Sequence, residues 1–369
     1  MSHCPLRLWA ALVAASLFAP AVAAAAPKGL DQKGKPPLKS AGPLAFAPEG
    51  VLLVGDPLGA AVFAIDTNEP EGKSAGGAIN VKQIDRKIAA LLGTSADQIL
   101  INDLAVNPAA GSVYMSVSRG RGPDAAPVIV RMDHTGKLSE FALDDVNYAE
   151  AALPNAPDPA AKDRRGNSQR TETITDLAYV DGRVIVAGLS NEEFASKLRS
   201  LPFPFDESDA GTSVEIYHGS HGKFETQSPV RTFVAYTIDG EPNLLAAYTC
   251  TPLVKFPVAQ LSPGAKVQGV TIAELGNQNR PLDMIIYQKD GGDFVLMAND
   301  RRGVMKIPTG DFAAAEAIET RVPDKAGVGY ETIADLKGVV QLDRLDADHA
   351  LVLVKTEAGE LACQTVPLP

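Results

Sequence analysis

The sequence predicts an all-β protein, a β-propeller with six blades, with seven blades as the alternative count. Three observations favour this fold. A unit of two to three short strands recurs along most of the 369 residues, strong helix signals are scarce, and the strands of each unit are apolar on one face. A ring of such units buries these faces against one another and leaves only short strand edges exposed.

Each recurring unit pairs an alternating strand with a more apolar strand across a turn of Gly, Asp or Pro, as a hairpin requires. The clear copies are PLAFAPEGVLLVGD (43–56), DLAVNPAAGSVYMSV (103–117), DLAYVDGRVIVAG (176–188), DMIIYQKDGGDFVLMA (283–298) and LDRLDADHALVLV (342–354). A weaker copy begins at Asn243 (NLLAAYTCTPLVKFPV), and third strands are expected at 60–64, 128–132, 214–218 and 303–307. A pair of β-sandwich domains is the alternative architecture.

The segments between these units are expected to be short helices, tethers and spacers. Residues 84–92 (IDRKIAALL) and 192–198 (EEFASKL) are predicted as the short helices. Residues 27–42 are rich in Lys, Pro and Gly and read as a flexible or extended edge segment. The spacers 144–175 and 199–213 are long, and we expect the apolar Pro202–Phe205 stretch to pack against the propeller.

The first 26 residues read as a secretory signal peptide. Arg7 ends a weakly basic start, residues 8–18 (LWAALVAASLF) are an apolar run too short for a permanent membrane span, and residues 21–23 (AVA) fit the small-residue cleavage pattern. A membrane anchor is the alternative. We therefore expect a periplasmic or secreted protein, with no transmembrane segment in the mature chain and with one propeller domain over residues 43–369.

In its blade rhythm the chain resembles secreted bacterial propeller proteins of the six-bladed NHL, TolB and lactonase-like kind. The resemblance covers most of residues 43–369 and depends on the repeated units, without a diagnostic motif. It implies six blades around a channel and says little about chemistry. Lactonase-like propellers bind a divalent ion with Glu, Asn and Asp at the channel mouth, whereas this chain has Pro43 where the first blade would supply Glu.

Charge and motifs exclude several classes of function. The 34 Lys and Arg against 45 Asp and Glu give a net charge of −11, which argues against nucleic acid as a partner. The chain has no CxxCH, no HExxH and no Walker loop, which argues against c-type haem, zincin and nucleotide chemistry. A quinoprotein dehydrogenase is disfavoured because the one tryptophan, Trp9, lies in the signal peptide.

The candidate ligand site lies where loops of equivalent position in each blade emerge on one face around the channel. Aspartates begin the first strand of three copies, with Asn243 in the weak copy. The predicted site residues are Asp56, Asp103, Arg119, Asp176, Asp283, Asn299 and Arg301. Oxygen ligands from several blades suit a divalent cation such as Ca²⁺. The alternative is that each aspartate only accepts backbone N–H groups and fixes its turn.

Two further clusters carry possible chemistry. His218 and His221 stand as His-x-x-His on a Gly-rich turn and can hold a transition metal, with Glu215 or Glu225 as a third ligand, or they are incidental surface histidines. Cleavage of the signal peptide would remove Cys4 and leave Cys250 and Cys363. These two residues form a disulfide or stay as two separate thiols.

Two functional classes therefore stay open. The first is an exported propeller that binds a small molecule, a metal ion or a partner protein on its loop face. The second is a metal-dependent hydrolase of lactonase-like kind with its site at the channel mouth. The first needs no catalytic set, and the second needs three or more convergent ligands for its ion.

Overall fold

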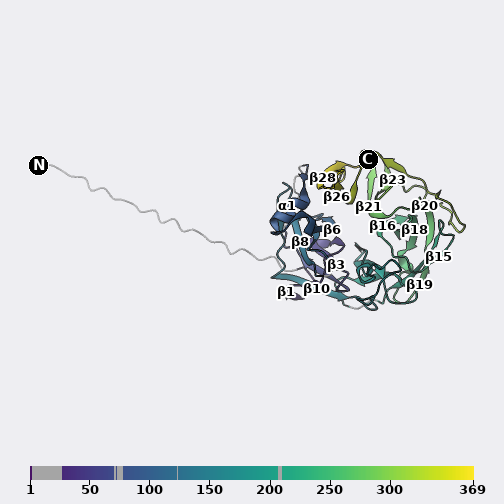
Figure 1. Cartoon of the computed structure of the whole chain (residues 1–369), viewed down its shortest axis with the longest axis horizontal. Coiled ribbons are helices and arrows are strands. Elements are labelled where there is room, and N and C mark those ends of the chain that lie inside the picture. Colours follow the sequence, from purple (N-terminus) through teal and green to yellow (C-terminus); the bar gives the residue numbers. More distant parts are fainter. Residues whose placement is uncertain (2–26, 70–71, 73–77, 123, 207–209) are drawn as a thin grey trace.

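In the computed structural model the chain forms a ring of six β-sheets around a central channel, which confirms the predicted six-bladed propeller (Figure 1). The structure describes residues 1, 27–69, 72, 78–122, 124–206 and 210–369. The signal peptide predicted at residues 1–26 lies outside this part except for Met1. In the described ranges, no helix is both long and apolar enough to cross a membrane.

We number the blades by the chain order of their innermost strands, and give the strands of each from the channel outward. Blade 1 is β2 (Leu44–Ala47), β3 (Val51–Asp56), β4 (Ala61–Asp66), β10 (Val146–Ala152) and β1 (Gln32–Gly34). Blade 2 is β6 (Ile99–Val106), β7 (Val113–Arg119), β8 (Ala126–Met132) and β9 (Leu138–Glu140). Blade 3 is β11 (Asp176–Val180), β12 (Arg183–Leu189), β13 (Ser196–Pro202), β14 (Thr212–His218) and β15 (Lys223–Glu225), with β19 (Lys266–Gln268) also paired to β14.

The remaining blades come from the second half of the chain. Blade 4 is β16 (Thr232–Ile238), β17 (Glu241–Ala247), β18 (Pro252–Pro257), β20 (Val270–Leu275) and β24 (Lys325–Gly327). Blade 5 is β21 (Pro281–Lys289), β22 (Gly292–Asn299), β23 (Val304–Pro308) and β25 (Glu331–Ile333). Blade 6 is β26 (Val339–Arg344), β27 (His349–Lys355), β28 (Leu361–Pro367) and β5 (Asn80–Lys82).

Three Asp-Gly pairs set the register of the inner hairpins in blades 3, 4 and 5. Both residues of each pair have positive φ, for example 45° at Asp181 and 79° at Gly182. A two-residue turn of this kind matches the twist of the flanking strands, which is why Asp-Gly is a strong hairpin signal. The other two pairs are Asp239-Gly240 and Asp290-Gly291.

The blades do not follow one another around the ring in chain order. Strand β2 lies between β6 of blade 2 and β11 of blade 3, and β6 in turn lies between β2 and β26 of blade 6. The order around the ring is therefore blade 1, 2, 6, 5, 4, 3, and in Figure 1 the blue segments stand between the yellow and the purple ones. Two strands stabilise this order by pairing outside the blade that precedes them in the chain. Strand β5 follows β4 of blade 1 and pairs with β28 as the outer strand of blade 6. Strand β10 follows β9 of blade 2 and pairs with β4 of blade 1.

The hydrophobic core lies between adjacent blades. One cluster joins blades 1 and 3 through Leu53, Val62, Val186 and Leu201. Other clusters join blades 1 and 2, blades 2 and 6, and blades 5 and 6. Because each blade buries its two faces against different neighbours, the permuted order is fixed by packing as well as by strand pairing.

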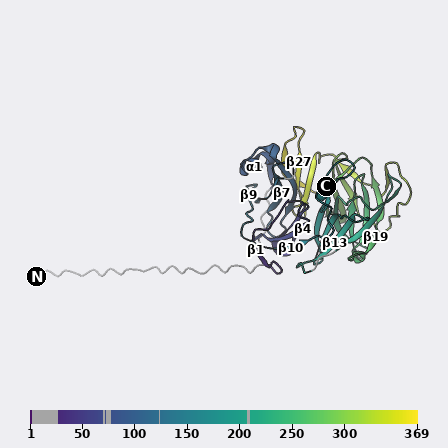
Figure 2. The same cartoon turned by 60° about the horizontal axis from the view of Figure 1, so that its bottom comes forward.

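The predicted helix at 84–92 is present as α1 (Ile84–Leu91), which packs on β28, β6 and β9 (Figure 2). Ile84 and Ile88, one turn apart, are fully buried and face this surface. Two residues after the helix, Gly93 has a φ of 65°, which lets Thr94 N–H bond back to Ala89 O at 2.9 Å. Four one-turn 3-10 segments complete the helical content of the described part, at Pro48–Gly50, Ala96–Gln98, Arg170–Glu172 and Val258–Gln260.

Three sequence expectations on the strands are wrong. The helix expected at 192–198 is a turn followed by β13, because a segment this short gains more from pairing with β12 than from one helical turn. The third strand expected at 214–218 belongs to β14, the fourth in its blade. Asn243 lies in the second strand of blade 4, and the inner strand is β16, eleven residues earlier at Thr232.

Candidate functional site

The inner strands bring three of the predicted aspartates to one level of the channel. Asp103, Asp176 and Asp283 each accept two backbone N–H groups, one from the next residue of their own strand and one from the inner strand of a neighbouring blade. We call these three residues the aspartate ring. At Asp176 the donors are Leu177 and Phe233, both at 2.8 Å.

The same two bonds recur at the other members of the ring. Asp103 accepts from Leu104 at 2.8 Å and Leu44 at 2.7 Å, and Asp283 accepts from Met284 and Leu342, both at 2.8 Å. The three carboxyl groups thus join blades 2 and 1, 3 and 4, and 5 and 6. The backbone-capping role, one of the two expected alternatives, is therefore present at every member.

The residues between the aspartates at this level are not acidic. They immediately precede the neighbouring donors and are Pro43, Thr232 and Gln341. Going round the channel, a carboxyl group alternates with one of these residues, so each aspartate serves two blades. In this alternation Pro43 of blade 1 lies between Asp103 of blade 2 and Asp176 of blade 3.

A fourth channel carboxyl, Asp343, was missed by the sequence analysis. Its oxygens accept the N–H groups of Val106 at 2.7 Å and Arg344 at 2.6 Å, which joins blades 6 and 2. Gln341 adds a bond from Nε2 to Asn102 O at 2.9 Å. The signal was the period of two along a strand: a side chain two residues after the channel-facing Gln341 points the same way.

Burial raises the pKa of all four channel carboxyl groups. It takes the pKa of Asp176 to about 7 and that of Asp343 to about 6, against the opposing effect of their backbone hydrogen bonds. Burial also raises the pKa of Asp103 and Asp283 well above the ordinary value. Repulsion from Asp176 and Asp343 raises both pKa values further, and repulsion from Asp103 adds to the effect at Asp283. Asp176 and Asp343 therefore give up their protons near neutral pH.

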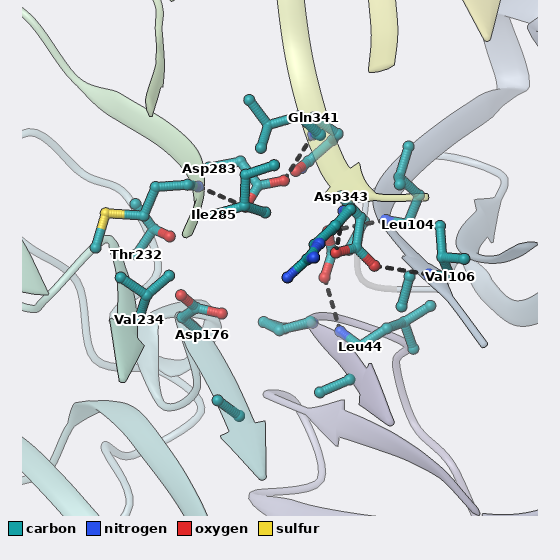
Figure 3. A pocket seen from close by; sticks show the side chains of 18 of the residues that line it. Leu44, Leu104, Val106, Asp176, Thr232, Val234, Asp283, Ile285, Gln341 and Asp343 are labelled. Carbon is teal, nitrogen blue, oxygen red and sulfur yellow. Dashed lines mark hydrogen bonds between the residues drawn. The ribbon is translucent and has the colours of Figure 1, made fainter. Parts of the chain in front are cut away.

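These carboxyl groups face one cavity of about 680 Å³ lined by all six inner strands. In Figure 3 the side chains of Asp176, Asp283 and Asp343 point toward the same open space from different blades. The charged residues of the lining are five acids and two arginines, namely Asp103, Asp176, Asp283, Asp343, Asp346, Arg231 and Arg344. The remaining wall is largely apolar, with side chains such as Val234 and Ile285.

A second hollow of about 420 Å³ adjoins this channel and shares Pro43, Asn102, Thr175 and Arg231 with it. Its charges are different. Arg231 forms an ion pair with Glu172, and Arg280 is close enough to lower the pKa of Arg231 together with the larger effect of burial. One mouth of the acidic channel is thus lined by guanidinium groups.

The other four predicted site residues do not line the channel. Asp56 is fully buried and accepts the N–H groups of Lys39, Ser40 and Gly59, which fixes the β3–β4 turn. Asn299 similarly holds its own turn through bonds to Met297 O and Gly303 O. The other two, Arg119 and Arg301, are exposed at strand or turn ends.

His218 and His221 lie outside the channel, at the β14–β15 turn of blade 3. The expected alternative of a disulfide between Cys250 and Cys363 is not formed; both thiols are free, because blade 5 separates their blades. Burial raises the pKa of Cys363 to about 12, as fits a core thiol in β28.

The channel does not present a compact calcium site. Ligands of one Ca²⁺ ion lie about 2.3–2.6 Å from it, so their oxygens lie within about 5 Å of one another. Among the described residues, the one group of three or more His, Cys, Asp or Glu with ligand atoms within 4.8 Å of one another lies elsewhere, at the β14–β15 turn. The channel aspartates are spaced around the ring instead of gathered on one point.

Comparison with known proteins does not assign this chain to a family. No family model matches the chain, and no curated protein matches it either. Among solved structures, a protein assigned as an oxidoreductase (glucose dehydrogenase) from Thermus thermophilus is similar at 12% identity with a TM-score of 0.34, covering 91% of this chain and 99% of that one. The PQQ-bound aldose sugar dehydrogenase from Streptomyces coelicolor is similar at 14% identity with a TM-score of 0.31, covering 91% and 96%. The class of this protein, a six-bladed propeller with an acidic channel, thus follows from its own sheets and side chains.

Proposed function

We propose that this protein is an exported propeller that binds a small organic ligand in its central channel, with an amine of the ligand held by the channel carboxyl groups. The observation that carries the proposal is the excess of five acids over two arginines around one cavity of about 680 Å³. A cavity of this size is typical of small-molecule sites, which bury most of the ligand against apolar walls and fix it by a few polar groups.

Repulsion between the carboxyl groups supports a cationic ligand. Asp176 and Asp343 raise the pKa of both Asp103 and Asp283, and Asp103 also raises that of Asp283, so further negative charge in the channel is disfavoured. An ammonium group placed between Asp103 and Asp283 would favour the ionised forms and lower both pKa values. Each carboxylate oxygen accepts one backbone N–H and keeps a lone pair for such a ligand. Binding of the amine should therefore release protons.

The mouth supports an acidic group at the other end of the ligand. Arg231 and Arg280 lie where the channel opens into the neighbouring hollow, and Arg231 is matched by Glu172. Arg280 is exposed, and no ion pair within the described ranges involves it. A guanidinium group in this position suits a carboxylate or phosphate.

Isothermal titration with three probes of similar length tests the proposal: putrescine, γ-aminobutyrate and butanediol. We expect γ-aminobutyrate to bind most tightly, putrescine less tightly, and butanediol not at all. Repeating the titration near pH 6.5 in two buffers of different ionisation enthalpy measures the protons released. Equal binding of butanediol would contradict the role of the carboxyl groups.

Matched variants separate the channel from the surface. Asp343→Asn keeps the shape of a channel residue and removes its charge, and we expect at least a tenfold loss of affinity for the amine probes. Asp300→Asn removes an exposed carboxyl that only accepts Arg280 N–H at 2.8 Å, and we expect no loss. Identical affinities for the two variants would place the ligand outside the channel.

An enzyme is the second candidate, favoured by one observation. The pKa values of Asp176, about 7, and Asp343, about 6, suit a general acid and base at neutral pH. The metal-dependent form of this hypothesis lacks a three-carboxylate ligand set in the channel. Ring opening of γ-butyrolactone followed in a pH-stat, with Asp176→Asn as the comparison, tests it: catalysis by the wild type that the variant loses would favour the enzyme.

Export belongs to the proposal and has its own measurement. The apolar run at 8–18 and the AVA sequence at 21–23 support cleavage near residue 24. Expression of the full chain with fractionation and N-terminal sequencing should find a processed chain outside the cytoplasm. An intact Met1 on exported protein would contradict it.

A further inference from the structure

A second cluster of reactive side chains lies where a turn of blade 3 meets a turn of blade 4. His218 ends β14, and His221 follows in the turn that leads to β15. Cys250 stands in the turn between β17 and β18 of blade 4. One ligand atom from each of the three residues lies within 4.8 Å of the other two. Segments some 30 residues apart in the sequence therefore deliver three metal-binding groups to one point.

The two histidines are held by a shared carboxylate. Glu225 accepts from His218 Nδ1 through Oε2 at 2.9 Å and from His221 Nδ1 through Oε1 at 2.8 Å. The imidazole rings lie 3.8 Å apart between centroids. Because both Nδ1 atoms are occupied by Glu225, the Nε2 atoms are left to bind something else. A carboxylate behind the histidine is the usual arrangement around metal-ligating imidazoles, where it fixes the ring and its tautomer.

The free nitrogen of His218 has no hydrogen-bond partner. The side chain is 2% exposed, and its Nε2 atom is buried without a donor or acceptor. Leaving such an atom unpaired costs free energy in a folded protein, so buried nitrogens of this kind usually have a ligand or an ordered water. One ring nitrogen of His218 lies within 4.8 Å of a ring nitrogen of His221 and of Cys250 Sγ.

The cysteine turn is held in an unusual backbone conformation. Cys250 and Thr251 have φ values of 65° and 54°, a region that β-branched residues rarely adopt. Cys250 N–H donates to Asn279 O at 2.7 Å, and Thr251 Oγ1 donates to Gly276 O at 2.6 Å. Backbone conformations of this kind concentrate at functional sites, and here the two hydrogen bonds fix the turn that carries the thiol.

We propose that His218, His221 and Cys250 form a binding site for a transition-metal ion of the zinc and copper class. Two imidazoles and a thiolate are the donors these ions prefer, whereas Ca²⁺ and Mg²⁺ prefer oxygen. Three protein ligands leave one position of a tetrahedral ion open, as in catalytic rather than structural zinc sites. His221 is 44% exposed, so the site can be reached from solvent. The site is separate from the central channel and does not depend on the function proposed for it.

A second buried acid, Glu274, lies beside the histidine turn and would stabilise a bound cation there. Glu274 is 1% exposed and accepts Gly219 N–H, in the turn between the two histidines, at 2.5 Å through Oε1. Its Oε2 atom has no hydrogen-bond partner. Glu274 pairs with Pro252 across the strands, next to the cysteine turn. It is outside the group of ligand atoms within 4.8 Å, so we assign it to charge balance and not to coordination.

Metal binding by the purified full-length protein tests the site directly. After removal of metals by chelation, titration with Co²⁺ should give the intense visible bands of a tetrahedral thiolate complex at one ion per chain, and Zn²⁺ should displace it. Zn²⁺ should also protect Cys250 from alkylation, which is read out in a Cys4→Ala background. Absence of stoichiometric binding by both ions would overturn the proposal.

Paired variants keep the test clear of folding defects. His221→Asn and Cys250→Ala should each weaken Zn²⁺ binding at least tenfold, and the exposed His221 position tolerates change. His349→Asn and Cys363→Ala are the matched controls, since His349 is also 44% exposed and also bonded to a carboxylate through Nδ1. Glu225→Gln, a positioning residue, should weaken binding roughly 10–100-fold and leave the cobalt spectrum tetrahedral. Wild-type affinity in both His221→Asn and Cys250→Ala would overturn the assignment.

Discussion

The channel and the histidine–cysteine turn differ in how their buried polar atoms are satisfied. Each carboxyl of the aspartate ring already accepts two backbone N–H groups, and so it does structural work whether or not a ligand is present. At the turn, His218 Nε2 is buried with no partner, although the rest of the ring is held firmly by Glu225. A buried polar group that already has hydrogen-bond partners within the fold is a weaker indication of a ligand than a buried polar group that the fold positions and leaves unpaired.

The largest expected effect comes from removing a carboxyl group that joins two blades. Asp176→Ala leaves the N–H groups of Leu177 and Phe233 without their acceptor at the junction of blades 3 and 4. We expect the free energy of unfolding to fall by about 2–4 kcal/mol, from two buried donors at about 1–3 kcal/mol each with partial replacement by channel water. Urea denaturation measures this difference.

The same measurement on the turn sharpens the comparison. In metal-free protein, His221→Asn removes a half-exposed side chain whose bond to Glu225 contributes little, so we expect a change within about 0.5 kcal/mol. If Asp176→Ala and His221→Asn lower the free energy of unfolding equally, the channel carboxyl groups are no more important for stability than the histidine turn.

The sequence predicts the features of this fold that depend on local patterns. The Asp-Leu and Asp-Met repeats are local signals, and the common level of Asp103, Asp176 and Asp283 follows from them. The blade count follows from the recurring hairpin units, which also occur in blades 1 and 6. In blade 4 the Asp239-Gly240 turn marks the inner hairpin, whereas the apolar run after Asn243 forms the second and third strands.

Other features depend on contacts that no local pattern encodes. The permuted ring order arises because β5 and β10 pair with strands more than 60 residues away in the chain. Cys250 lies close to His218 and His221 because blade 3 packs against blade 4. A sequence gives the residue types of such a site, but their convergence requires the assembled ring.

The pH dependence of stability gives an intermediate effect. Burial raises the folded-state pKa of Asp176 from 3.8 to about 7, so between these values the unfolded chain releases a proton that the folded chain keeps. This group's contribution to stability is therefore complete below about pH 4 and is lost as the pH rises through 7. Asp176→Asn cannot titrate, so the stability advantage of the wild type over this variant should shrink by up to about 1.4 kcal/mol per pH unit in that window. An advantage that grows with pH would mean that the carboxylate is held ionised.

The smallest effect is expected at the predicted site residues that face away from the channel. Arg301 is exposed, and its backbone N–H donates to Asn279 Oδ1 at 3.3 Å, a bond that does not involve the guanidinium group. Arg301→Ala should therefore change the free energy of unfolding by less than about 0.5 kcal/mol and leave the affinity for γ-aminobutyrate unchanged. Arg280→Ala, at the mouth of the channel, is the matched arginine and should weaken γ-aminobutyrate binding while sparing putrescine. If Arg301→Ala weakens binding as much as Arg280→Ala does, the ligand lies on the outer loops and the channel is only a structural core of carboxyl groups.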